Sequence, residues 1–196
     1  MIHEIIPVGM LQCNCSIFGD EASGEAVVID PGDEIGRITA ILDQHHLRVK
    51  AIIITHAHID HIGGAQKLKA LTGAPVYMNA NDQELYDHID TQAQWLGVAP
   101  PEKTGIDVNA REDEVVKLGP AEFRVLETGT NSVDIRVAEG STYTSRTVIS
   151  RGAATSGRGG RWFRRHTRKL ASVGDSAGGT RSVRLWLKTW VAGACA

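Results

Sequence analysis

The sequence predicts an α/β domain in which short strands alternate with amphipathic helices. Three short apolar segments separated by turn residues predict an antiparallel meander near the N-terminus. A strand, a loop, a helix and a second strand then follow one another over residues 49–78, as in a β-α-β unit. Two further apolar segments flank Gly119-Pro120 and predict a hairpin over residues 115–126.

The first helix and the strands before it are indicated by the spacing of apolar residues. Ile35, Ile38 and Leu42 recur at helical spacing and predict an amphipathic helix over residues 34–46. The strands of the meander are expected over residues 3–8, 14–18 and 25–29. Three histidines are expected to be exposed helix residues rather than ligands: His45, His46 and His88.

The β-α-β unit is centred on the most apolar strand of the chain. Ala51-Ile52-Ile53-Ile54 predicts a buried strand over residues 49–54. The next helix is expected to begin near Ile62-Gly63-Gly64 and to end at Gly73 as its C-cap, with a strand over residues 75–78 beyond it. Asn81 is expected to cap a short helix.

A cluster of potential metal ligands follows this buried strand directly. The segment is Thr55-His56-Ala57-His58-Ile59-Asp60-His61. Imidazole nitrogens and carboxylate oxygens suit zinc, iron or manganese. His56 and His58 can share one face of an extended chain. Asp60 and His61 can point at a second metal nearby, as in two-metal hydrolases.

At these residues the chain resembles the metallo-β-lactamase superfamily, whose signature is His-X-His-X-Asp-His after a hydrophobic strand. Neighbouring segments narrow the resemblance to the small hydrolases similar to glyoxalase II, which act on hydroxyacyl-glutathione. The resemblance covers about residues 2–128. The matching segments are Pro7-Val8-Gly9, Gln12-Cys13-Asn14-Cys15 and Ala26-Val27-Val28-Ile29-Asp30-Pro31-Gly32.

The resemblance implies an αββα sandwich and a two-metal site, with zinc as the expected metal and iron or manganese as alternatives. It implies that His56 and His58 hold one ion and that Asp60 and His61 hold the other. Asp60 would also act in catalysis, by orienting a metal-bound hydroxide that attacks a thioester or related ester. Asp30 would hold the ligand loop by hydrogen bonds, because metal-bound imidazoles need their other nitrogen fixed.

Composition and the N-terminal sequence bear on location and partners. A hydrophobic content of 42% and a charged content of 22% are typical of soluble globular proteins. The N-terminus lacks a basic segment followed by a long apolar run, so we expect a cytoplasmic protein without a membrane partner. Cys13 and Cys15, two apart on a strand, are not expected to form a disulfide. The expected partner is a small thioester or ester substrate, nucleic acid is not expected, and the oligomeric state stays open.

Residues 129–196 differ in character from residues 1–128, and we place a domain boundary between them. The first part carries 9 Lys and Arg against 20 Asp and Glu, a net charge of −11, and the second carries 12 against 3, a net charge of +9. The second part contains ten Arg and ten Gly, and its strand and helix periodicity fades, which is typical of poorly ordered sequence.

The metal ligands that the family places late in the chain are missing from their expected positions. The family has Thr-Pro-Gly-His after the strand that corresponds to residues 123–126, whereas this chain has Glu127-Thr128-Gly129-Thr130. Gly174-Asp175 and His166 come in the wrong order to replace the later ligands. We therefore expect weak metal binding and impaired hydrolysis.

Two interpretations of the basic segment remain open, and the first is favoured. A shift of reading frame near codon 128 explains the missing ligands, the charge reversal and the lost periodicity together. A basic arm for nucleic acid, with Trp162 and Phe163 among its arginines, explains the charge alone. Alternative functions are an inactive remnant of the fold, a nuclease or RNA-binding relative, and a mononuclear iron oxygenase.

Overall fold

The computed structural model describes residues 1–127, 133–139, 143–147, 170–171 and 181–185. Within these residues the strands form two six-stranded sheets, ordered β1-β2-β3-β4-β5-β6 and β11-β12-β10-β9-β8-β7. The first sheet contains β1 (Ile2–Val8), β2 (Cys13–Asp20), β3 (Glu25–Ile29), β4 (Arg48–Ile53), β5 (Val76–Met78) and β6 (Val108–Asn109). The second contains β7 (Val115–Leu118), β8 (Ala121–Glu127), β9 (Val133–Glu139), β10 (Tyr143–Thr147), β11 (Leu170–Ala171) and β12 (Arg181–Leu185).

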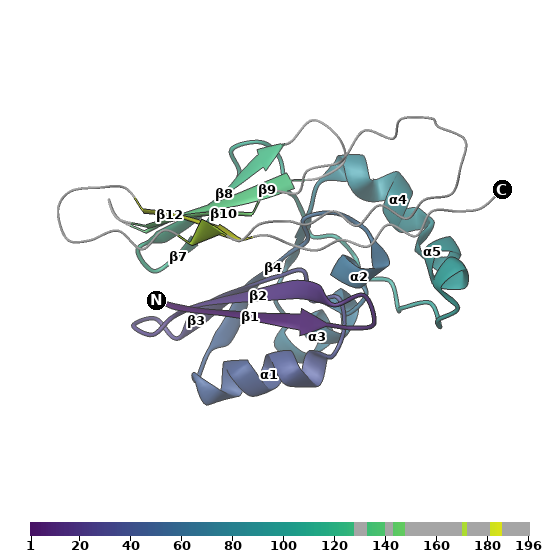
Figure 1. Ribbon diagram of the computed structural model, residues 1–196, viewed down its shortest axis with the longest axis horizontal. Coiled ribbons are helices and arrows are strands. Elements are labelled where there is room, and N and C mark those ends of the chain that lie inside the picture. Colours follow the sequence, from purple (N-terminus) through teal and green to yellow (C-terminus); the bar gives the residue numbers. More distant parts are fainter. Residues whose placement is uncertain (128–132, 140–142, 148–169, 172–180, 186–196) are drawn as a thin grey trace.

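The helices of the described residues lie along the first sheet and beside its end (Figure 1). They are α1 (Ile35–Gln44), α2 (Ile59–Ile62), α3 (Ala65–Thr72), the 3₁₀ helix η1 (Ala80–Asp82), α4 (Gln83–Asp87) and α5 (Ile89–Leu96). Helices α1 and α3 cover the outer face of the first sheet, while the second sheet lies over its inner face. This arrangement confirms the α/β sandwich expected from the sequence.

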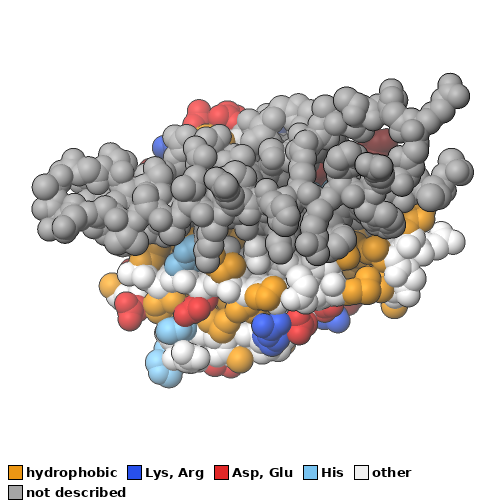
Figure 2. All heavy atoms as spheres, in the orientation of Figure 1, with side chains coloured by type: hydrophobic (Ala, Val, Ile, Leu, Met, Phe, Trp, Pro, Cys, Tyr) orange, Lys and Arg blue, Asp and Glu red, His pale blue; other side chains and the backbone are white. Residues whose placement is uncertain are grey.

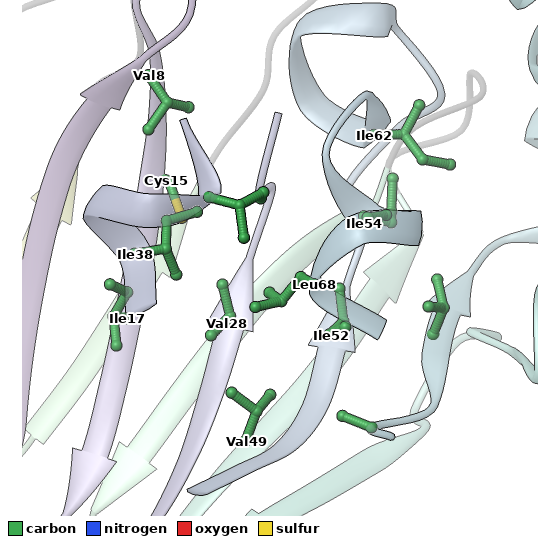
Figure 3. Close-up of a cluster of buried hydrophobic side chains, with 14 of the residues drawn as sticks. Val8, Cys15, Ile17, Val28, Ile38, Val49, Ile52, Ile54, Ile62 and Leu68 are labelled. Atoms are coloured by element: carbon green, nitrogen blue, oxygen red, sulfur yellow. The ribbon is translucent and has the colours of Figure 1, made fainter. Parts of the chain in front are cut away.

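The last three residues of β4, Ala51 to Ile53, and the following Ile54 are buried on both faces, which explains their continuous apolar run. Ile52 and Ile54 pack in a core between the first sheet and helices α1 and α3 (Figure 3). Ala51 and Ile53 point the opposite way, into a second core between the two sheets. Alternate side chains of a strand face opposite sides, so a strand between two layers needs apolar residues at every position.

Most elements predicted from periodicity are confirmed within one or two residues at each end. Strands β1, β2 and β3 form the antiparallel meander, β7 and β8 form the hairpin, and β4 pairs in parallel with β5. Helix α3 ends at Gly73, whose φ of 70° is the left-handed C-cap conformation expected there.

Two local predictions need correction, and a helix was missed. The cap of the short helix after β5 is Asn79, whose side chain accepts a hydrogen bond from the Asn81 backbone N–H, so the prediction for Asn81 is wrong. Helix α5 was not predicted at all. His46 and His88 are exposed as expected, but the side chain of His45 is only 24% exposed, and its Nε2 lies 3.9 Å from Oε1 of Glu4.

Strand structure continues past residue 128, which the fading periodicity did not predict. Strand β9 pairs antiparallel with β8, from Val133 opposite Glu127 to Glu139 opposite Ala121, and β10 pairs with β9. The shift of reading frame that the sequence suggests near codon 128 stays a prediction. The other residues singled out after position 128, Trp162-Phe163, His166 and Gly174-Asp175, lie outside the described residues.

The surface formed by the described residues is mixed in character. On the face shown in Figure 2, acidic, basic and hydrophobic side chains are interspersed below the grey atoms. Among the described residues, no helix combines the length and apolar character needed to cross a bilayer.

His3 on β1 makes the stability of the folded protein depend on pH. Its ring stacks on Phe18 across the strand pair at 3.9 Å between centroids, and burial lowers the pKa of His3 from 6.5 to about 4. Its buried Nε2 makes no hydrogen bond within the part of the chain that the structure describes. The folded protein therefore favours the neutral ring, and protonation opposes folding.

We expect the free energy of unfolding to fall as the pH is lowered from 6.5 to 4. The unfolded chain binds more protons than the folded chain in this window, so the contribution of His3 is complete above pH 6.5 and is lost below it. A loss on the order of 2 kcal/mol follows, since each pKa unit is about 1.4 kcal/mol and the ring is partly solvated. His3→Phe should reduce this slope in urea unfolding curves, while His46→Asn, at an exposed position, should keep it.

Candidate metal centre

The ligand loop leaves the end of β4 and turns directly into α2. The helix predicted to begin near Ile62-Gly63-Gly64 and to end at Gly73 is confirmed as α3, which begins at Ala65 after its N-cap Gly64. The short helix α2 before it was not predicted, and it includes Asp60 and His61. His58 is the residue before the helix, with extended backbone angles. The four predicted ligands are thus divided between an extended segment, which carries His56 and His58, and one helical turn, which carries Asp60 and His61.

Asp30, at the end of β3, is hydrogen-bonded to this loop through both of its carboxylate oxygens. Its Oδ1 accepts from the Thr55 N–H at 2.8 Å, and its Oδ2 accepts from the Thr55 hydroxyl at 2.6 Å. The same Oδ2 lies 2.9 Å from Nδ1 of His61. The prediction that Asp30 holds the ligand loop by hydrogen bonds is confirmed.

His61 is oriented so that its second nitrogen faces Asp60. Because Asp30 is an acceptor at Nδ1, the proton of the neutral ring is assigned to Nδ1, and Nε2 then carries the lone pair. Nε2 is buried without a hydrogen-bond partner in the described residues, in a side chain that is 1% exposed, and lies 3.6 Å from Oδ2 of Asp60. A buried lone pair beside a carboxylate is a donor arrangement that suits a divalent cation.

The three imidazoles of the motif lie close together. The ring centroid of His56 is 3.9 Å from that of His61 and 4.6 Å from that of His58. His56 is buried, and its Nδ1 lies 3.1 Å from the Thr55 hydroxyl, which donates its own proton to Asp30 and can therefore accept from His56. Thr55 thus connects His56 to the same carboxylate that orients His61.

Cys13, on β2, is a neighbour of the centre that the motif did not include. Ligand atoms of Cys13, Asp60 and His61 lie within 4.8 Å of one another. However, Sγ of Cys13 approaches His61 at Nδ1, at 3.5 Å, and Asp30 already occupies that nitrogen. Cys13 therefore lies on the Nδ1 side of the imidazole, and Asp60 lies on the Nε2 side, which has no hydrogen-bond partner in the described residues.

Negative charge dominates the electrostatics of the centre. Burial opposes protonation of His61, but the charge of Asp30, the hydrogen bond from Asp30 and the charge of Asp60 raise its pKa above the usual value. Burial and the charges of Asp30 and Asp60 also raise the pKa of the Cys13 thiol, and burial and Asp30 raise that of Cys15. Within the described residues, Cys13 and Cys15 are buried and form no disulfide, as expected of this pair.

Glycines allow the segment after β3 to contact the ligand loop backbone directly. A Cβ atom on Gly32 would lie 1.6 Å from the carbonyl oxygen of Asp60, and one on Gly64 would lie 2.3 Å from that of Pro31. No other residue fits at such a distance without moving the backbone. Gly32 and Gly64 therefore fix how closely the segment that follows Asp30 approaches Asp60.

Helix α5 supplies a contact to the loop that sequence reasoning missed. Gln92 is 8% exposed, and its side chain is hydrogen-bonded to the backbone of Ala57 and Ile59. A signal for the helix was present, since Ile89, Ala93 and Leu96 share helical spacing and Gly97 follows them as C-cap with a φ of 67°.

The fold and the site together define a class of protein, the α/β sandwich with a histidine-rich metal loop at the end of a buried strand. A family model described as the metallo-beta-lactamase superfamily matches residues 8–135, about where the predicted resemblance ends. The chain belongs to the metallo-β-lactamase superfamily, whose members bind divalent metals.

Relatives of known sequence include proteins with and without a described activity. An uncharacterized protein of Aquifex aeolicus is 44% identical over 131 residues, which are 65% of this chain and 60% of that protein. The hydroxyacylglutathione hydrolase GloC of Haemophilus influenzae is 35% identical over 130 residues, 63% of this chain and 58% of that protein. The matched part thus spans less than two thirds of these relatives. An uncharacterized protein of Mycobacterium bovis is 32% identical over 198 residues, 90% of this chain and 88% of that protein.

Solved structures share the fold. The di-iron-bound form of TTHA1623 is 29% identical with a TM-score of 0.62, covering 78% of this chain and 76% of that one. BLEG-1, a B3 metallo-beta-lactamase, is 22% identical with a TM-score of 0.64, covering 74% of this chain and 71% of that one.

Replacement of Asp30 tests the hydrogen bonds that hold the loop. Asp30→Asn keeps the size of the side chain but turns an NH₂ group toward donors, so we expect the free energy of unfolding to fall by about 2–4 kcal/mol. The pKa of His61 should also fall, which NMR titration of the histidine ring measures. Asp43→Asn, at an exposed position of α1, should change the stability by less than about 0.5 kcal/mol. Equal stability of both variants would contradict a supporting role for Asp30.

Proposed function

We propose that this protein is a metal-dependent hydrolase of the glyoxalase II-like type that cleaves thioesters or related small esters. The observation that carries the proposal is the buried Nε2 of His61, oriented by Asp30 at Nδ1 and facing Asp60. Relatives named hydroxyacylglutathione hydrolase, from Haemophilus influenzae and Bdellovibrio bacteriovorus, are 35% and 36% identical over the parts that match. They support a hydroxyacyl thioester as the substrate class.

The proposed metal ligands fall into two pairs. His56 and His58, whose rings lie 4.6 Å apart, would hold one ion, and Asp60 with His61 would hold the other. Zinc suits imidazole and carboxylate donors, and iron and manganese accept the same set. The di-iron-bound form of TTHA1623, at 29% identity, makes iron the main alternative.

In such a site, different residues of the chain would have different roles. Bound metal would supply Lewis acidity, which lowers the pKa of water and stabilises negative charge on a substrate oxygen. Asp60, which faces His61, would also orient the attacking hydroxide. Asp30 and Thr55 keep the imidazoles of His61 and His56 in the orientation that leaves Nε2 without a proton.

We infer that this hydrolase is impaired in the chain as written. Each proposed ion has two ligands from the motif, whereas a catalytic zinc usually has three from the protein. The family's next histidine would fall after Thr128, where the sequence continues Gly129-Thr130, outside the described residues. Weak metal binding and slow turnover follow from this deficit.

A shift of reading frame near codon 128 is our proposal for the origin of residues 129–196. The net charge of +9 over these residues, against −11 before them, supports it. The match to the Mycobacterium bovis protein, which covers 90% of this chain and so extends into these residues, opposes it. Sequencing the gene across codons 120–196 and translating all frames tests it directly. A frame that supplies Pro-Gly-His, then Gly-Asp, then Gly-His is the expected result, and its absence would contradict the frameshift.

Zinc titration of the purified chain tests the proposed site. We expect measurable but weak Zn²⁺ binding in calorimetry, and a further loss of at least about tenfold in affinity for His61→Gln, because this variant removes the oriented nitrogen. His46→Asn, with an exposed histidine removed, should bind like the wild type. Equal affinity of His61→Gln and the wild type would contradict the assignment.

Hydrolysis of a 2-hydroxyacyl thioester of glutathione, followed by release of the thiol, tests the activity. We expect a slow, metal-dependent rate that Asp60→Asn lowers about 10²-fold or more, since misplacing the attacking group can cost about 10²-fold. Restoring a histidine after Thr128 alone should not rescue turnover. Turnover without added metal, or at the full rate of an intact family member, would contradict the proposal of an impaired metal hydrolase.

A further inference from the structure

Gln92 connects helix α5 to the ligand loop through three hydrogen bonds. Its Oε1 accepts from the backbone N–H of Ile59 at 2.9 Å, and its Nε2 donates to the carbonyl oxygen of Ala57 at 3.1 Å. Nε2 also donates to the carbonyl oxygen of Leu85 at 3.1 Å, which ties the same side chain to α4. One buried amide therefore bonds the backbone on both sides of His58.

We propose that Gln92 is a positioning residue for the metal centre, which sets the backbone of the ligand loop at His58 and at the start of α2. The proposal rests on the metal site proposed above, because its consequence is the placement of His58, Asp60 and His61. Gln92 lies 33 residues beyond Ile59 in the sequence, so the contact is made only by the folded chain.

The hydrogen bond to Ile59 replaces an N-terminal helix cap. The first N–H groups of a helix lack partners inside the helix, and the residue before it commonly supplies one from its side chain. That residue is His58, whose side chain makes no such cap. Gln92 supplies the acceptor from another helix, so that a proposed metal ligand can stand at the cap position.

The second hydrogen bond fixes the residue on the other side of His58. Ala57 is fully buried, and a buried carbonyl oxygen without a partner costs about 1–3 kcal/mol. An amide side chain has the donor and the acceptor that Ala57 and Ile59 require. Glutamate offers only the acceptor when ionised, and methionine of similar length offers neither a donor nor a comparable acceptor.

Methionine substitutions at Gln92 and Gln94 separate this role from a general loss of stability. Gln94 is exposed on the same helix and is the matched control. Co²⁺ serves as the metal probe, because its visible absorption bands report ligand geometry as well as affinity. The second measurement is hydrogen exchange at the Ile59 amide in the metal-free protein, which requires no metal binding.

We expect Gln92→Met to weaken Co²⁺ binding by about tenfold or more, to alter the Co²⁺ bands, and to speed exchange of the Ile59 amide by about tenfold. Gln94→Met should change none of these. Gln92→Glu keeps the acceptor, so Ile59 should stay protected while Co²⁺ affinity falls. If Gln92→Met does not fold, Gln92→Glu tests the positioning role by the same two measurements.

Several results would overturn the positioning role. Wild-type Co²⁺ affinity and bands in Gln92→Met, despite faster Ile59 exchange, would leave Gln92 a structural residue only. Unchanged Ile59 protection in Gln92→Met would overturn the proposed contact itself. If the wild type binds no Co²⁺ or Zn²⁺, the proposed metal function fails, and Ile59 exchange alone then decides whether Gln92 holds the loop.

Discussion

The structure of the centre depends on one buried carboxylate, Asp30, and on the hydrogen bonds it accepts. A buried charge is tolerated only when donors surround it, and Asp30 finds these donors in Thr55 and His61. The backbone N–H of Asp30 also donates to the carbonyl oxygen of Ile53, which extends the pairing of β3 with β4 by one residue. The carboxylate is therefore held at the end of one parallel strand and organises the loop at the end of the next. Sites in α/β sheets commonly form at this edge, where the carboxyl ends of parallel strands meet.

The two layers on either side of β4 determine where the ligand loop begins. Apolar side chains fill both faces of β4, with Ile52 toward the helices and Ile53 toward the second sheet. A strand fixed by packing on both faces delivers His56 and His58 from a defined position. Close backbone contact between Gly32 and Asp60 then sets the position of α2 relative to the end of β3. The glycines that accompany the motif in sequence thus have a steric reason to be there.

How far the sequence predicts this structure depends on the distance over which each signal acts. Local periodicity predicts β1 to β4 and α1, because apolar spacing within a dozen residues decides them. It fails at the cap after β5, where Asn79 and Asn81 are both plausible and only the backbone geometry selects Asn79. The contact of Gln92 with Ile59 could not be predicted, since it joins segments whose relative placement tertiary packing decides. Cys13 reaches His61 for the same reason, through the pairing of β2 in the sheet.

The charges of the centre give a physical reason to expect a cation there. Asp30 and Asp60 flank the imidazole of His61, and together they raise its pKa against the effect of burial. The hydrogen bonds from Thr55 and His61 compensate Asp30, whereas Asp60 faces a nitrogen that has no proton to donate when the ring is neutral. Without a cation, the pair gains a favourable contact when the ring is protonated, which the raised pKa of His61 favours although burial opposes it. A divalent ion between Nε2 and the carboxylate would satisfy both groups with the ring neutral. Metal binding at this nitrogen would therefore compete with a proton, because the same carboxylates that would attract a cation also favour the protonated ring.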